Sequence, residues 1–232
     1  MSGKRVVFWR HGRTRWNAQR RFQGQSDVEL DAEGRIQTVT AAERVARLDP
    51  TAIISSDLIR ARVTADALAT RTGLPVVEDS RLRETSGGSW EGLSRAEIEA
   101  LQPGALAAWA AGSDLRPGGG ERRSEVALRM IAAVEDALDA VPDNSVLVVV
   151  SHGGSSRAAM ATMLGLPVSH WGIFGVLANC GWSVLAETVG MAERIGNLAA
   201  SASDEFPDVP PLPDWRLIEY NGAIPRPVRP TH

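Results

Sequence analysis

Short apolar segments alternate with amphipathic ones along most of this chain of 232 residues, and this alternation constrains the fold more than any other feature of the sequence. SVLVVVS, at 145–151, is the strongest candidate for a buried strand. Val6 to Trp9, TAIISS (51–56) and LPVVED (74–79) are further short strands. Strands separated by helices imply right-handed crossovers and a mostly parallel sheet covered on both faces. We therefore expect an α/β fold, a three-layer α/β/α sandwich with a mostly parallel central sheet.

The segments between these strands have helical periodicity. In the first, Asp31 is an N-cap candidate, and the apolar stripe includes Ile36 and Val39. In the second, Gly73 is a natural C-terminal stop. The sequence predicts helices over 30–48, 57–73, 121–141 and 157–164, and two more strands over 181–187 and 215–221.

The regular alternation lapses between residues 81 and 120. Two turn-rich stretches, TSGGSWEGLS and GSDLRPGGGE, enclose two short helical pieces there. We expect a lid-like insertion within a single domain over 1–222, and a disordered proline-rich tail over 223–232.

Composition excludes several classes of protein. A formal net charge of −3 gives no indication of the positively charged surface that binds nucleic acid. No apolar run reaches the roughly 18 residues that a membrane span needs. The single cysteine, Cys180, reads as a buried thiol and suits a reducing compartment, so we expect a cytoplasmic protein. We expect no metal, because no Asp, Glu and His cluster has the spacing of a ligand set.

Polar motifs follow three of the predicted strands at their carboxyl ends. Arg10 and His11 follow the first strand, His152 follows the strongest one, and Arg60 lies one turn into the helix after the second. Parallel sheets bind their ligands at this edge. The two histidines and two arginines are therefore expected to converge on one crevice.

These residue types suit phosphoryl transfer. The forks of Arg10 and Arg60 can hold one phosphate dianion from two sides, and the glycine-rich turn at Gly153 opens a helix whose N–H groups favour anions. A neutral His11 can attack phosphorus if its other ring nitrogen is held as N–H. Cationic neighbours lower the pKa of His11, and a protonated His152 would stabilise charge on the transferring group.

An alcohol leaving group needs a proton, and Glu84 is the candidate donor. It stands in RLRETSGGSWEG, just after the third strand, at the same edge of the sheet. A buried carboxyl beside a phosphate dianion can act first as acid and then as base for water. The alternative is a surface ion pair with Arg81 or Arg83.

Four motifs, RHGRTRWN, SSDLIRARVTA, RLRETSGGSWEG and VVSHGG, resemble those of the histidine phosphatase superfamily, in its phosphoglycerate-mutase-like branch. The resemblance implies a phosphohistidine enzyme with His11 as nucleophile and a phosphate pocket of Arg10, Arg60 and His152. It also implies Glu84 as proton donor and contacts to phosphate or substrate from Asn17, Gln23 and Gly24. SSDLIRA, RTGLPV, RLRET and PGALAAW carry a closer likeness to the glucosyl-3-phosphoglycerate phosphatase group.

The chain departs from the family pattern at two places. Arg13 and Arg15 stand where many relatives have acidic, small or aromatic side chains, and they either favour acidic esters or lie in solvent. Gly118 to Arg123 resembles the family's Gly-Gly-Glu-Ser segment without its serine at the usual place, so no role follows for Glu121, Arg122 or Arg123.

The function expected is that of a phosphomonoesterase acting on small sugar- or glycerate-type phosphoesters, without a cofactor and as a homodimer. A bisphosphoglycerate-dependent mutase is the first alternative. Here the region after Glu84, from Trp90 to Trp109, has one arginine and no tyrosine, which disfavours it. A non-catalytic module that binds phosphorylated partners is the second alternative. We expect Trp90 to border the pocket and His170 to have no catalytic role.

Overall fold

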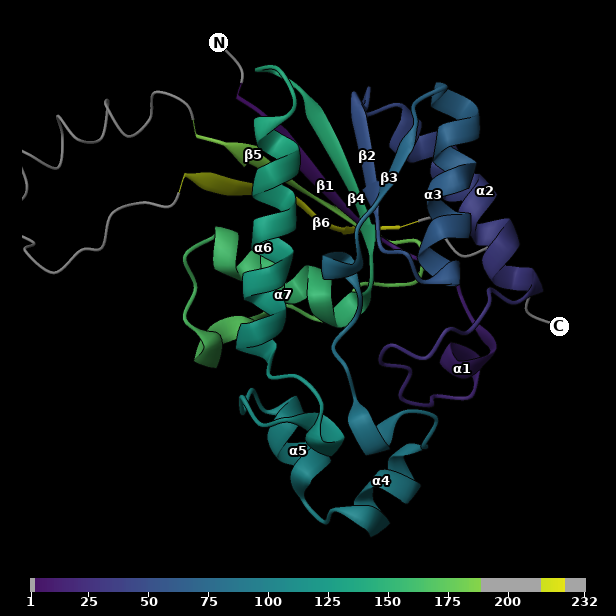
Figure 1. Cartoon of the computed structure of the whole chain (residues 1–232), viewed down its shortest axis with the longest axis vertical. Helices are drawn as coiled ribbons and strands as arrows, with labels where there is room; N and C mark the ends of the chain where they lie inside the picture. Colours follow the sequence, from purple (N-terminus) through teal and green to yellow (C-terminus); the bar gives the residue numbers. More distant parts are fainter. Residues whose placement is uncertain (1–2, 189–213, 224–232) are drawn as a thin grey trace, which may run out of the picture.

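A computed structural model of the chain describes residues 3–188 and 214–223. Within them, one six-stranded sheet has the order β3-β2-β4-β1-β5-β6 (Figure 1). β1 pairs in parallel with β4, and β2 pairs in parallel with β3 and β4, whereas β5 runs antiparallel to β1 and β6. The strands are β1 (Arg5–Arg10), β2 (Ala52–Ser55), β3 (Val76–Glu78), β4 (Val146–Ser151), β5 (Trp182–Glu187) and β6 (Trp215–Gly222). The predicted mostly parallel sheet is confirmed.

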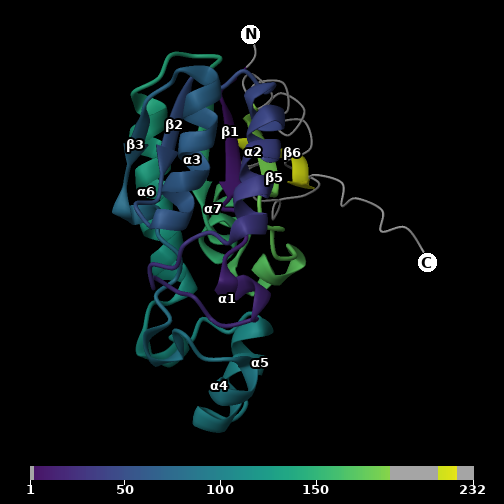
Figure 2. The same cartoon turned by 90° about the vertical axis from the view of Figure 1, so that its right-hand side faces the viewer.

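Helices cover both faces of the sheet, as Figures 1 and 2 show, and so confirm the three-layer prediction. α2 (Ala32–Ala46) and α3 (Ile59–Thr72) pack on one face, and α6 (Arg123–Asp139) and α7 (Gly153–Met163) pack on the other. Neighbouring residues of β1 point to opposite layers. Val6 and Phe8 join the core under α6 and α7, while Val7 and Trp9 join the core under α2 and α3.

Short helices lie beyond the carboxyl ends of the parallel strands (Figure 1). They are α1 (Arg15–Ala18), α4 (Arg95–Leu101) and α5 (Ala105–Ala110). The described residues also form the 3-10 turns η1 (Ser80–Leu82), η2 (Gly88–Trp90), η3 (Pro117–Gly119) and η4 (Val168–Ile173). α4 and α5 occupy the region expected to form the lid. The single-domain division stays a prediction, and most of the proline-rich tail lies outside the described residues.

Two expectations about helices were wrong in detail. Ile36 and Val39 are 68% and 53% exposed, because α2 buries a face of small residues instead: Gly34, Thr38, Ala41, Ala42 and Val45. A Cβ at Gly34 would lie 1.9 Å from the carbonyl oxygen of Arg13, so the backbone approaches too closely there for a larger residue. α7 begins at Gly153 rather than at Arg157. The Asp31 cap and the left-handed Gly73 stop are confirmed.

Candidate active site

The register of three neighbouring strands brings the polar motifs together. Arg10 pairs with Ser151 across β1 and β4, so His11 and His152 leave adjacent strands side by side. Their ring centroids are 5.2 Å apart, which confirms the expected convergence. β2 lies on the other side of β4 and delivers Ser56 and Arg60 to the same edge.

The His11 ring is fixed with one nitrogen free. Its Nδ1 lies 2.7 Å from the carbonyl oxygen of Gly12, which accepts a hydrogen bond from an Nδ1–H and leaves Nε2 with its lone pair. Burial, and then the charges of Arg60 and Arg10, hold the pKa of His11 well below its usual range. His11 is therefore a neutral imidazole near neutral pH. A Cβ at Gly12 would lie 2.5 Å from the carbonyl oxygen of Gly34, so only glycine fits beside it.

The structure differs from the sequence expectation at His152. Its Nδ1 accepts a hydrogen bond from Nε of Arg60 at 3.2 Å, and its Nε2 lies 2.9 Å from Oγ of Ser56. Since Arg60 has only donors, Nδ1 carries no proton. Burial, and then Arg60, lower the pKa of His152 well below 6.5. His152 is thus neutral, lies behind Arg60 rather than on the pocket surface, and orients that guanidinium.

Arg60 and Arg10 present positive charge to the pocket from a buried setting. Arg60 is fully buried, and its terminal nitrogens donate to the carbonyl oxygens of Ser26 (2.7 Å) and Gly24 (2.8 Å). Burial lowers its pKa to about 10 and also lowers the pKa of Arg10. Nε of Arg10 is buried without a hydrogen-bond partner, and among the described residues neither arginine forms an ion pair with a carboxylate. An anionic ligand suits this pair.

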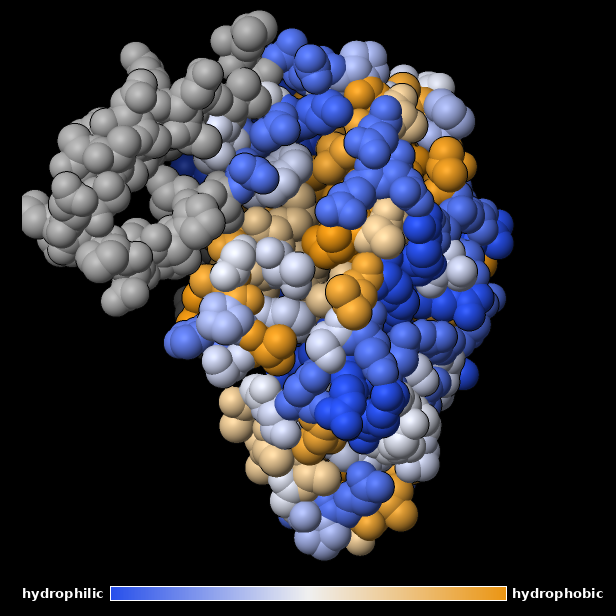
Figure 3. Space-filling model, turned by 60° about the vertical axis from the view of Figure 1, so that its left-hand side comes forward, coloured by the Kyte–Doolittle hydropathy of each residue, from blue (hydrophilic) through white to orange (hydrophobic). Residues whose placement is uncertain are grey.

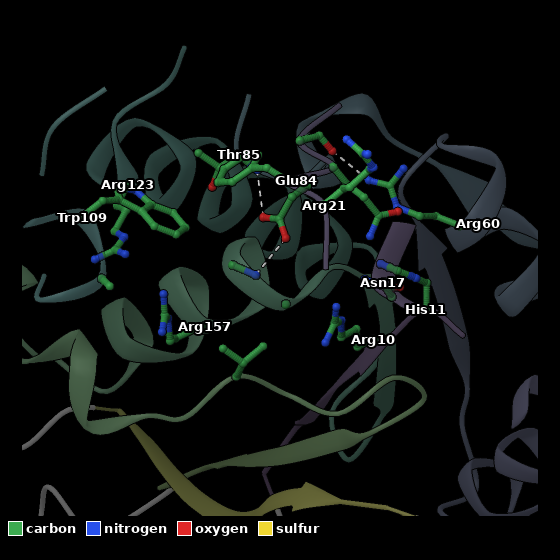
Figure 4. A pocket seen from close by; sticks show the side chains of 17 residues that line it. Arg10, His11, Asn17, Arg21, Arg60, Glu84, Thr85, Trp109, Arg123 and Arg157 are labelled. Carbon is green, nitrogen blue, oxygen red and sulfur yellow. Dashed lines mark hydrogen bonds between the residues drawn. The ribbon is translucent and has the colours of Figure 1, made fainter. Parts of the chain in front are cut away.

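Glu84 lies at the N-terminus of α7, not in a surface ion pair. Its Oε1 accepts hydrogen bonds from the backbone N–H groups of Thr85 (2.8 Å) and Ser155 (2.9 Å), and Oε2 accepts one from Gly154 (2.9 Å; Figure 4). A carboxylate oxygen has two lone pairs. Oε1 therefore has both occupied, while Oε2 keeps one site for a proton. A Cβ at Gly154 would lie 2.6 Å from Oε1, so this contact needs glycine.

The segment after β1, which includes α1, supplies two amides. Oδ1 of Asn17 accepts hydrogen bonds from the backbone of Thr14 (3.1 Å) and from Nδ2 of Asn179 (3.0 Å). Oε1 of Gln23 accepts from Oγ1 of Thr14 at 2.8 Å. With both oxygens engaged, the NH₂ groups of Asn17 and Gln23 are the ends available to a ligand.

These side chains surround a pocket of about 370 Å³. Eight of the nine residues singled out in the sequence line it: Arg10, His11, Asn17, Gln23, Gly24, Arg60, Glu84 and Gly153. The ninth, His152, does not. The expected pocket role of Trp90 was wrong, because this residue is fully buried against Phe22 and Trp109.

Nine lining residues were missed by sequence reasoning, and three arginines and a tryptophan among them bear on ligand binding: Arg21, Arg123, Arg157 and Trp109. For two of these four the sequence offered a signal: the unusual GGGERR cluster that ends at Arg123, and the helical spacing of Arg157 from Gly153. Arg13, by contrast, forms ion pairs with Asp31 and Glu33 and does not line the pocket, and neither does Arg15.

The pocket is strongly cationic. Its lining contains five arginines and one carboxylate, that of Glu84. Within the described ranges, no group of three or more His, Cys, Asp and Glu side chains could hold a metal ion. Within the same ranges, no helix is long and apolar enough to cross a membrane.

The model of the histidine phosphatase superfamily (branch 1) matches residues 6–193. This chain belongs to that family. A glucosyl-3-phosphoglycerate phosphatase from Mycolicibacterium vanbaalenii is 43% identical over 229 residues, 96% of this chain and 96% of that protein. A probable phosphoglycerate mutase, GpmB, from Salmonella paratyphi C is 37% identical over 216 residues, 87% of this chain and 98% of that protein.

The solved structures also match proteins of this family. A mycobacterial glucosyl-3-phosphoglycerate phosphatase in complex with VO3 is 38% identical, with a TM-score of 0.81. The match covers 94% of this chain and 99% of that one. The fold of this chain is therefore that of a histidine phosphatase.

Proposed function

We propose that this protein is a phosphomonoesterase that hydrolyses a sugar-linked phosphoglycerate, of the glucosyl-3-phosphoglycerate type, through a phosphohistidine on His11. One observation carries the proposal: Nε2 of a neutral His11 and the one free oxygen site of Glu84 line the same arginine-rich pocket. The relatives named as phosphatases support the same reaction class.

In the first step, the lone pair on Nε2 of His11 attacks phosphorus while the bond to the ester oxygen breaks. The forks of Arg10 and Arg60 hold the phosphoryl oxygens and stabilise their charge. Glu84 delivers a proton from Oε2 to the departing alkoxide. The products are a free alcohol, a phosphorylated His11 and an ionised Glu84.

In the second step, water attacks the phosphohistidine. Glu84 accepts a proton from the water as the new oxygen–phosphorus bond forms and the nitrogen–phosphorus bond breaks. His11 leaves as a neutral imidazole, which its low pKa favours. Inorganic phosphate is released and both groups return to their starting states.

His152 acts on Arg60 in this scheme. The Ser56 hydroxyl holds the His152 ring at Nε2, and the neutral Nδ1 of that ring fixes the guanidinium plane, so that the remaining N–H groups of Arg60 face the phosphate. This role replaces the direct contact with phosphate that the sequence suggested.

A mutase remains the alternative function, because a relative carries that name. A mutase must retain a phosphorylated product while it reorients. Of the described residues 85–110, the pocket lining takes Thr85, Trp109 and Ala110, none of which is cationic. The stretch 85–110 thus adds no positive charge of its own to the pocket, which favours release of the product and attack by water.

The test compares products. With 3-phosphoglycerate and 2,3-bisphosphoglycerate as substrates, the proposal expects free phosphate in step with substrate loss. Isomerisation to 2-phosphoglycerate without free phosphate would establish the mutase. A turnover screen over phosphorylated sugars, glycerates and nucleotides, with glucosyl-3-phosphoglycerate included, then ranks the substrates.

A cytoplasmic location and a homodimer also belong to the proposal. The thiol of Cys180 is buried, and burial raises its pKa to about 11, which suits an unreactive cysteine in a reducing compartment.

Exposed apolar side chains are the surface feature that bears on the homodimer. Figure 3 shows apolar residues scattered among polar ones on one face, and Leu128 and Val77 are exposed apolar residues of the described chain. Light scattering coupled to gel filtration tests the dimer: a mass of one chain contradicts it.

A further inference from the structure

Arg123 is a buried cation at the start of α6. Only 6% of the residue is exposed, and its Nε is buried without a hydrogen-bond partner. Among residues 3–188 and 214–223, no carboxylate forms an ion pair with it. Such a charge costs free energy unless something compensates for it. Its guanidinium nevertheless lines the pocket.

The surroundings hold this guanidinium in place without neutralising it. Its Cζ lies 4.2 Å from the ring centroid of Trp109, in a cation–π contact. Trp109 packs in turn against Phe22 and Trp90. Burial, and then the positive charge of Arg157, lower the pKa of Arg123 to about 10. Two cations thus stand close together on one wall, and an anion between them would relieve both their repulsion and their desolvation.

This wall is separate from the phosphate end of the pocket. Figure 4 shows Arg123, Trp109 and Arg157 on one side of Glu84, and His11, Arg10 and Arg60 on the other. A ligand whose reacting oxygen lies at Glu84 therefore has positive charge on both sides. One end meets the phosphate-binding arginines, and the other meets Arg123 and Arg157.

We propose that Arg123, supported by Arg157, binds a second anionic group of the substrate, the carboxylate of the glycerate unit, and so determines specificity for phosphoglycerate-type esters. The inference rests on the proposed function for the identity of the substrate. A planar carboxylate matches the fork of a guanidinium held flat on an indole ring. Trp109 is a positioning residue that fixes the plane of the fork.

The test uses two esters that differ at one group. D-3-phosphoglycerate has a carboxylate where glycerol 3-phosphate has a hydroxymethyl group. We expect wild-type protein to prefer the phosphoglycerate in kcat/KM, and Arg123→Met to reduce that preference by about 10- to 100-fold, the size of a charge-assisted hydrogen bond. The matched control is Arg122→Met, which removes the same charge from the exposed neighbouring residue and is expected to keep the wild-type preference.

Each other outcome overturns the inference. Wild-type protein without a preference, an equal loss on both esters in Arg123→Met, or a loss of preference in Arg122→Met would do so. Should Arg123→Met fail to fold, Arg123→Lys replaces it: a point charge in place of the fork is expected to lower the preference, and an unchanged preference overturns the inference.

Failure of the proposed function gives a different result. Wild-type protein that hydrolyses neither of these esters nor glucosyl-3-phosphoglycerate refutes the phosphatase, and the inference is then judged by calorimetric binding of the two esters to the His11→Ala variant. Tighter binding of D-3-phosphoglycerate that Arg123→Met abolishes supports the subsite. Equal binding of the two esters refutes it.

Discussion

Replacing Glu84 with glutamine separates proton donation from helix capping. Glu84→Gln keeps the size of the side chain but removes the ionisable group. General acid catalysis contributes about 10²- to 10⁴-fold. We expect kcat for an alkyl phosphate to fall by that factor, because its alkoxide cannot leave without a proton. A nitrophenyl phosphate carries a much better leaving group, so its first step is expected to slow far less.

The same change weakens the α7 N-terminus by a definable amount. Glutamine can accept hydrogen bonds only at Oε1, so one of the three N–H groups now bonded to Glu84 meets an NH₂ group instead. Losing a hydrogen bond to a charged acceptor costs about 1.5–3 kcal/mol. At about 2–4 °C per kcal/mol for a chain of this size, Tm is expected to fall by about 3–12 °C.

The assay measures single-turnover rates of phosphorylation for both esters below the melting range of the variant. A larger loss on the alkyl ester than on the nitrophenyl ester supports proton donation by Glu84. Equal losses on the two esters would refute it and leave Glu84 with a structural role. A variant as active and as stable as wild type would refute both arguments.

Three further predictions concern the same site. Unfolded histidine binds a proton below about pH 6.5, whereas burial lowers the pKa of folded His11 and His152, so the free energy of unfolding is expected to fall as the pH drops from 7 to 5. Chemical denaturation at the two pH values measures it, and equal stability would contradict the neutral pair. Gly154→Ala would place a Cβ 2.6 Å from Oε1 of Glu84, so we expect kcat to fall by at least about tenfold. Gly172→Ala is the control, because a Cβ at Gly172 would have no heavy atom within 4 Å. Equal rates in the two variants would show that the close approach of Gly154 to Glu84 does not matter. Turnover is expected to persist in excess chelator, and a loss that a divalent ion restores would end the metal-free mechanism.

The sequence was informative where chemistry follows a strand. His11 and His152 could be placed together because parallel strands end at one edge of the sheet, and the register of β1 and β4 bears this out. Gly73 and Asp31 were readable because their roles depend on local backbone conformation. Such features need no knowledge of the rest of the fold.

The remaining features depend on contacts that no local pattern encodes. α2 buries small residues instead of Ile36, because its backbone lies close to the loop at Arg13. The tautomer of His152 depends on where the guanidinium of Arg60 points. No role could be assigned to Arg123 from the sequence, because its contact with Trp109 and its place in the pocket depend on tertiary packing.

The central claim is that phosphate passes through the Nε2 atom of His11. Mixing the protein with substrate in large excess, quenching it within the first turnovers at alkaline pH and mapping the peptides by mass spectrometry tests this directly. We expect one phosphoryl group on His11 and none in the His11→Ala variant, which should also lose turnover. Phosphate found on another residue, or full turnover by His11→Ala, would contradict the account.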